Sequence, residues 1–123
     1  MQDISLKGLR VLILEDEALI ALDLEQVFRD LGADEVIIAH SLDGLDAAFD
    51  IAVLDVTLAG RPMAGFAAEL FARGVALVFV TCASDAAGLL DGLPGVQIVD
   101  KLFSDDAIER AIAEALRLAR EGG

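Results

Sequence analysis

Three carboxylates stand at the ends of apolar runs, where their chemistry could be combined. Glu15 and Asp16 follow the run 11–14, and Asp55 follows the run 51–54. An ionised carboxylate is costly to bury unless it is paired or metal-bound, so these positions call for a physical reason. If both runs are strands of one parallel sheet, the carboxylates converge at its carboxyl edge, where open α/β sheets bind ligands. Three negative charges in one crevice favour a divalent cation there.

Two further polar residues follow apolar runs. Thr81 comes directly after residues 76–80, and Lys101 stands two residues past residues 96–99. With the carboxylates, these side chains suit phosphoryl transfer. An aspartate can accept a phosphoryl group covalently, so Asp55 is the candidate acceptor. A lysine ammonium and a threonine hydroxyl can each contact a phosphoryl oxygen.

Magnesium is the cation that fits this chemistry. Mg²⁺ prefers oxygen ligands and often takes one or two carboxylates together with phosphate oxygens. It neutralises charge on the transferred group. The candidate ligands are three carboxylates and the backbone carbonyl near a threonine: Glu15, Asp16, Asp55 and Thr57.

Five apolar runs alternate with helical patterns along the chain. The runs are rich in Val, Ile and Leu with little polar alternation, which is typical of strands covered on both faces. They are residues 11–14, 35–39, 51–54, 76–80 and 96–99. The last run is the most mixed, which suits an edge strand. Right-handed crossovers between such strands predict an α/β fold, a doubly wound (βα)5 parallel sheet with helices on both faces.

Five segments between and after these runs are predicted as helices: 17–31, 41–49, 63–73, 84–90 and the segment that follows Ser104. Ile20, Leu24, Val27, Phe28 and Leu31 form the buried stripe of the first. Gly32 and Gly74 are expected to close the first and third helices, and Ser104 to cap the last. Residues 84–90 are weakly periodic, so we expect a loose element there.

The bulk composition narrows the function classes. The 123 residues suit one domain, and a hydrophobic content of 56% supports a real core. A net charge of −13 argues against nucleic acids and anionic membrane surfaces as partners. Cys82 is the only cysteine, and the chain has no signal-peptide pattern and no apolar stretch of membrane-spanning length. We therefore expect a cytoplasmic protein.

Four segments of the chain resemble the receiver domain of bacterial response regulators, which act in two-component signalling. They are Leu14-Glu15-Asp16-Glu17, Leu54-Asp55-Val56-Thr57-Leu58, Val80-Thr81-Cys82 and Asp100-Lys101-Leu102-Phe103. The resemblance covers nearly the whole length. It implies a single receiver domain over residues 1–123 with no output domain, and a flavodoxin-like sheet with strand order 2-1-3-4-5. Residues 78–81 are similar to a subgroup of stand-alone receivers named for a Phe-Ala-Thr-Gly motif, of which they keep the Phe and the Thr.

The same resemblance implies partners and a mode of action. A sensor histidine kinase or a histidine phosphotransfer protein would phosphorylate Asp55, with Mg²⁺ bound by the acidic pair. The chain would catalyse at most its own phosphorylation and dephosphorylation. It would contact a downstream protein through residues 84–90, residues 96–99 and the last helix, and a homodimer is compatible with this.

Three positions depart from the family pattern. Leu102 replaces the proline that usually follows the lysine, and Ile98 stands where the family commonly has an aromatic switch residue. A cis bond before a non-proline residue costs roughly 3 kcal/mol, so Lys101 is either re-aimed or held under strain. Ala59 stands where the family has proline after the acceptor. These departures concern the residues that would respond to phosphorylation, and they leave the acceptor Asp55 unchanged.

Two alternative functions stay open. A degenerate receiver would keep the fold and bind partners without phosphorylation. An aspartyl-phosphate phosphatase of the haloacid-dehalogenase kind needs Asp-x-Asp, whereas this chain has Asp55-Val56-Thr57. A flavin carrier of the same fold class is disfavoured because the chain has no Trp or Tyr to stack on the flavin.

Ordinary structural roles compete with the functional ones at several residues. Asp16 could cap the helix that follows it and still bind metal. Thr81 could be only a β-branched strand residue, and Lys101 only a surface lysine. Cys82 is expected to be a small hydrophobe rather than a reactive thiol, and His40 a surface residue. Phe79 and Phe103 are predicted to lie in the core.

Overall fold

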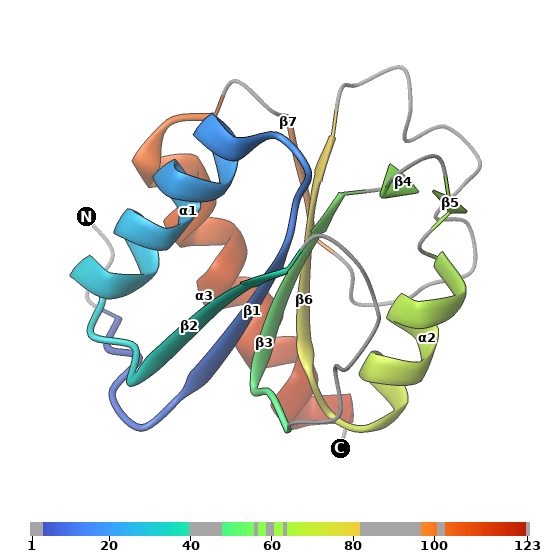
Figure 1. Cartoon of the computed structure of the whole chain (residues 1–123). Coiled ribbons are helices and arrows are strands. Elements are labelled where there is room, and N and C mark those ends of the chain that lie inside the picture. Colours follow the sequence, from blue (N-terminus) through green and yellow to red (C-terminus); the bar gives the residue numbers. More distant parts are fainter. Residues whose placement is uncertain are drawn as a thin grey trace.

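Five parallel strands form one twisted sheet (Figure 1). The computed structural model describes residues 4–39, 48–55, 57–58, 61–62, 64–81, 97–100 and 103–122. The strands are β1 (Arg10–Leu14), β2 (Glu35–Ala39), β3 (Ile51–Asp55), β6 (Ala76–Thr81) and β7 (Gln97–Asp100). Their order is β2-β1-β3-β6-β7, which confirms the predicted 2-1-3-4-5 arrangement and the edge position of the last strand.

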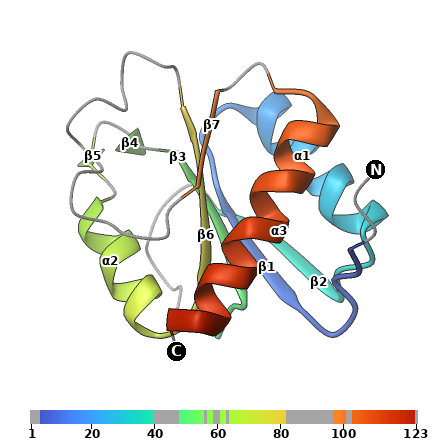
Figure 2. The same ribbon diagram turned by 180° about the vertical axis from the view of Figure 1, so that it is seen from behind.

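Helices cover both faces of this sheet, as predicted. The helices are α1 (Ala18–Asp30), α2 (Ala64–Ala72) and α3 (Asp105–Gly122). Helices α1 and α3 lie on one face, and α2 lies on the other (Figures 1 and 2). Two apolar cores result, one between the sheet and α1 with α3, the other between the sheet and α2. No helix in the described part of the chain is long and apolar enough to cross a membrane.

A short antiparallel pair, β4 (Thr57–Leu58) with β5 (Arg61–Pro62), lies between β3 and α2. This pair was not predicted from the sequence. Each strand has only two residues, which is too short for the alternation of apolar and polar side chains that identifies a strand.

Glycines close two helices at the predicted positions. Gly32 has a φ of +92°, and its N–H donates to the Arg29 carbonyl while that of Ala33 donates to Phe28, both bonds as in a Schellman motif. Gly74 ends α2 in the same way, with a φ of +85°. At the start of α3, the Ser104 hydroxyl accepts the Ala107 N–H at 3.2 Å, which confirms the predicted cap.

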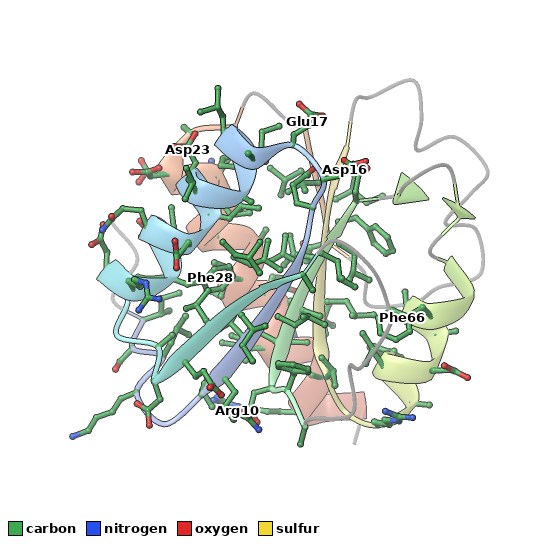
Figure 3. The ribbon with its side chains drawn as sticks, in the orientation of Figure 1. Arg10, Asp16, Glu17, Asp23, Phe28 and Phe66 are labelled. Atoms are coloured by element: carbon green, nitrogen blue, oxygen red, sulfur yellow. The ribbon has the colours of Figure 1, made fainter. Side chains whose placement is uncertain are left out.

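The structure corrects the predicted helix 41–49 at its end. Ala48 and Phe49 are not helical, while residues 41–47 lie outside the described part, as do 84–90. Arg10 explains the non-helical backbone: its guanidinium donates to the Ala48 carbonyl at 2.9 Å and lies 5.6 Å from the centre of the Phe49 ring. Arg10 also pairs with Glu35 at 2.6 Å. These contacts fix the end of the sheet opposite Asp16 (Figure 3).

Candidate functional site

The pairing of β1 with β3 brings the predicted carboxylates to one edge of the sheet. Leu14 is the register partner of Leu54, so Glu15, directly after β1, and Asp55, the last residue of β3, come next along two adjacent strands. One carboxylate oxygen each from Glu15, Asp16 and Asp55 lies within 4.8 Å of the other two. Parallel strands end at the same edge, so residues far apart in the sequence meet there.

The three carboxylates differ sharply in their exposure to solvent. Glu15 is fully buried, Asp55 is 7% exposed, and Asp16 is exposed. Burial penalises each charge, and like charges at this distance repel. The Glu15 Oε1 atom accepts the backbone N–H of Glu17 at 3.1 Å, which holds this carboxylate in place. The arrangement therefore places two buried carboxylates next to the solvent-exposed carboxylate of Asp16.

This set of donors fits a hard divalent cation. All three groups offer carboxylate oxygens, which are the ligands that Mg²⁺ prefers. Their mutual distances allow one ion to contact all of them. A cation here would also offset the cost of keeping the Glu15 and Asp55 charges away from water.

Asp16 does not cap helix α1. The N-cap residue is Glu17, and no side-chain hydrogen bond caps the helix. The predicted capping role is therefore wrong, because the helix begins one residue later than a cap at Asp16 would require. The side chain of Asp16 belongs instead to the carboxylate cluster.

The remaining predicted site residues are described only in part. Asp55 is the register partner of Val80, so the backbone of Thr81 lies at the same edge of the sheet. Thr57 lies in β4, two residues past the candidate acceptor. Lys101 lies outside the described residues. The same holds for His40, Ala59, Cys82 and Leu102.

The aromatic residues near the site are placed as predicted. Phe79 is fully buried, and Phe103 is partly buried against the core on the α3 side. Ile98, at the position of the family's aromatic switch, is 50% exposed on the edge strand β7. Its register partner is Phe79.

Sequence reasoning missed two exposed leucines on α1. Leu19 is 80% exposed and Leu22 is 55% exposed. The signal was present in the sequence, because neither leucine belongs to the buried stripe of this helix. Apolar residues outside such a stripe are expected to face solvent.

The fold and the carboxylate edge define a doubly wound α/β domain with a charged site at the ends of its strands. SdrG from Sphingomonas melonis Fr1 shares this fold at 31% identity and a TM-score of 0.74, with 94% of this chain and 99% of that chain covered. A response regulator receiver protein from Sinorhizobium medicae WSM419 is 24% identical, with a TM-score of 0.75 and coverage of 94% and 99%. The chain belongs to the family of response regulator receiver domains.

A third relative is a variant of the anti-anti-sigma factor PhyR from Bartonella quintana. It is 25% identical with a TM-score of 0.72, and the match covers 98% of this chain and 53% of that one. Among family models and curated sequences, no match to this chain is found. Receiver domains are signalling modules of two-component systems rather than classical enzymes, and this chain is such a module.

Proposed function

We propose that this chain is a single receiver domain controlled by phosphorylation of Asp55. A sensor histidine kinase or a histidine phosphotransfer protein supplies the phosphoryl group, and Mg²⁺ is held by Glu15, Asp16, Asp55 and the backbone carbonyl of Thr57. The observation that carries the proposal is the approach of three carboxylates to within 4.8 Å of one another. The family of the chain supports the same interpretation.

The proposed step is a transfer between two side chains. A carboxylate oxygen of Asp55 attacks the phosphorus of a partner's phosphohistidine, the new O–P bond forms, and the P–N bond breaks. The imidazole nitrogen that leaves takes up a proton from solvent. When bound, Mg²⁺ would supply positive charge that offsets the negative charge of the phosphoryl oxygens.

Each residue of the site has its own role in this phosphoryl transfer. Asp55, which is 7% exposed at the carboxyl edge of the sheet, is assigned as the acceptor. Glu15 is buried and fixed by the Glu17 N–H, so it gives a rigid negative charge for the cation. Thr81 and Lys101 are assigned to the phosphoryl oxygens, as a hydroxyl donor and a point charge.

Output is assigned to protein contact on the face formed by β7 and α3. A groove of about 990 Å³ runs between these elements, lined by Ile98, Phe103 and Ala107 with Arg110 and Glu114. Within the described part of the chain, Arg110 has neither a hydrogen bond nor an ion pair, so its charge is available to a partner. A downstream protein or a second copy of the chain could occupy this face. A cytoplasmic location fits both roles.

Labelling with acetyl phosphate tests the acceptor. We expect Mg²⁺-dependent incorporation of phosphate into the wild type and none into Asp55→Asn. Asp23→Asn is the matched control, because Asp23 is an exposed carboxylate on α1 outside the cluster and its loss should leave labelling intact. A wild-type protein that stays unlabelled with Mg²⁺ present would contradict the proposal.

A second candidate is a degenerate receiver that binds partners without phosphorylation. Leu102 and the exposed Ile98 favour it, because they replace the residues that usually report phosphorylation. Beryllofluoride, which imitates a phosphoryl group, separates the two candidates. Tight Mg²⁺-dependent binding of beryllofluoride excludes the degenerate receiver.

A further inference from the structure

Helix α3 gathers positive charge in a chain that is otherwise strongly acidic. The chain has 22 acidic residues against nine Lys and Arg, and α3 carries Arg110, Arg117 and Arg120. Arg117 and Arg120 are three residues apart, so they are neighbours on the surface of the helix. Arg117 pairs with Glu114, whereas Arg120 makes neither a hydrogen bond nor an ion pair within the described residues. The charge of Arg120 is therefore available to a partner.

A groove of about 370 Å³ adjoins these two arginines. It lies beside the segment that precedes β1, whereas the larger groove lies beside β7. Its lining consists of Ile4, Ser5, Ala113, Leu116, Arg117 and Arg120. Ile4 and Leu116 are only partly buried against the core, so they leave apolar area in the groove. The combination suits a partner that brings apolar side chains flanked by carboxylates.

The start of α1 presents the complementary combination. Leu19 is 80% exposed and Leu22 is 55% exposed, and we call these two residues the leucine patch. Asp23 is exposed, lies four residues after Leu19, and makes neither a hydrogen bond nor an ion pair within the described part of the chain. Glu17 adds a second exposed carboxylate at this end of the helix (Figure 3). The chain thus carries both an apolar patch with negative charge and an apolar groove with positive charge.

These two surfaces lie toward opposite ends of the molecule. Helices α1 and α3 each follow a strand, so both begin near the carboxyl edge of the sheet and run back from it (Figures 1 and 2). The leucine patch is in the first two turns of α1, whereas Arg117 and Arg120 are in the last two turns of α3. A contact between the patch of one copy and the groove of another leaves one free surface of each kind. Such a contact repeats from copy to copy.

We propose that the leucine patch of one copy docks in the groove beside Arg120 of a second copy, so that the chain assembles head to tail. This inference does not rest on the proposed function. The leucines cover the apolar lining at Ile4 and Leu116, and burial of this apolar area drives the contact. The charges set its direction, because patch against patch would bring carboxylates together and groove against groove would bring arginines together.

The contact is expected to be weak. Two leucines in a groove of this size make a small interface, at the low end of specific protein contacts. The net charge of −13 on each copy also opposes their approach, although physiological salt screens most of that repulsion. We therefore expect a Kd on the order of 100 µM.

Sedimentation equilibrium from micromolar to millimolar protein, at physiological salt, tests the assembly. Leu19→Ser removes an anchor from the patch, and Arg120→Glu reverses the charge beside the groove. We expect the average mass of the wild type to rise past that of a dimer. Each variant should need about tenfold more protein to reach the same average mass.

A mixture of the two variants gives the sharper test. Leu19→Ser keeps an intact groove and Arg120→Glu keeps an intact patch, so an equimolar mixture should form one-to-one pairs and grow no further. Arg110→Glu is the matched control, because it changes the net charge as Arg120→Glu does but lines only the groove beside β7. Ile98→Ser removes an exposed apolar side chain from that other side. Both controls should associate like the wild type.

Several results would overturn the proposal. A wild type that stays monomeric, or that stops at the dimer, contradicts head-to-tail assembly. The same conclusion follows if Leu19→Ser and Arg120→Glu associate like the wild type, or if their mixture associates no better than either alone. Equal losses in Arg110→Glu and Arg120→Glu would show that net charge, rather than the groove, governs association. Thermal unfolding checks that these substitutions at exposed positions leave the fold intact, and Leu22→Ser replaces Leu19→Ser if they do not.

Discussion

Glu15 and Asp55 follow paired leucines on adjacent parallel strands, and both carboxylates are withdrawn from solvent at the same edge of the sheet. Each adds a desolvation cost, and together with Asp16 they repel one another. A bound cation would offset both of these costs. The cluster therefore links metal binding, phosphorylation and stability.

Magnesium should stabilise the folded chain. Binding of an ion to the folded state alone adds about 2.7 kcal/mol at a concentration 100 times its Kd, a rise in Tm of roughly 10 °C for a domain of this size. Asp55→Asn should raise the Tm in EDTA, because the neutral amide removes one of the repelling charges, and should reduce the effect of Mg²⁺. Thermal unfolding with and without Mg²⁺ measures both. Identical Tm values for the wild type in the two conditions would argue against the metal site.

Two leucines on α1 should differ in their contribution to stability. Leu24 is fully buried against the sheet, so Leu24→Ala should lower the free energy of unfolding by about 2–5 kcal/mol through lost packing and a cavity. Leu22 is 55% exposed, and Leu22→Ala should change the free energy of unfolding by no more than about 0.5 kcal/mol. Urea denaturation of both variants makes the comparison. Similar losses for the two would show that the helix is rotated relative to the structure.

Two glycines of the α2 region should respond in opposite directions to alanine. Gly74 has a φ of +85°, where a Cβ is strained, so Gly74→Ala should destabilise the protein by about 1 kcal/mol. Gly65 lies within α2, and a Cβ there would meet nothing within 4 Å. Gly65→Ala should therefore stabilise the protein by up to about 1 kcal/mol. Chemical denaturation tests the signs, and a stabilising Gly74→Ala would refute the assigned backbone conformation.

Glu114 should make a small contribution to the dependence of stability on pH. A hydrogen bond from the Arg117 guanidinium holds the pKa of Glu114 below its ordinary value, helped by the charge of Arg117. A lowered pKa in the folded state gives stability that is present above the unfolded-state pKa and is lost as pH falls through the folded-state pKa. Arg117→Gln should therefore be less stable than the wild type at neutral pH, and the gap should close in acid.

Unfolding measurements at neutral and acidic pH test this prediction for Glu114. Both side chains are at the surface, so added salt should shrink the difference between Arg117→Gln and the wild type. Arg110→Gln is the matched control on the same helix, since this arginine has no ion pair within the described residues. A gap for Arg117→Gln that widens in acid would contradict the assignment.

The regular elements were predictable because their signals are local. The five main strands begin and end within one residue of the predicted runs, since each run is a short, continuous apolar stretch. Helix α1 follows its buried stripe, and Gly32, Gly74 and Ser104 close or open helices where they were expected to. Capping depends on a few neighbouring residues, which the sequence displays directly.

Two local predictions were wrong, and the cause in both is tertiary. Ala48 and Phe49 look helical in sequence but are held by Arg10, which comes from a strand 38 residues earlier. Asp16 has the side chain of a good N-cap, yet the turn that places it among the carboxylates starts the helix after Glu17. In both cases contacts between distant segments outweigh local preference.

The sequence by itself determined the parallel sheet and the residue types gathered at its carboxyl edge, because the alternation of apolar runs with helical patterns and the handedness of crossovers depend only on the pattern along the chain. The order of the strands followed from the resemblance to receiver domains. Only the tertiary structure decided that Glu15 is buried while Asp16 is exposed, and that their oxygens and that of Asp55 lie within 4.8 Å of one another. It also decided that Leu19 and Leu22 face solvent beside this cluster. Burial and distance are set by the neighbours that folding brings together, which the linear order of residues does not contain.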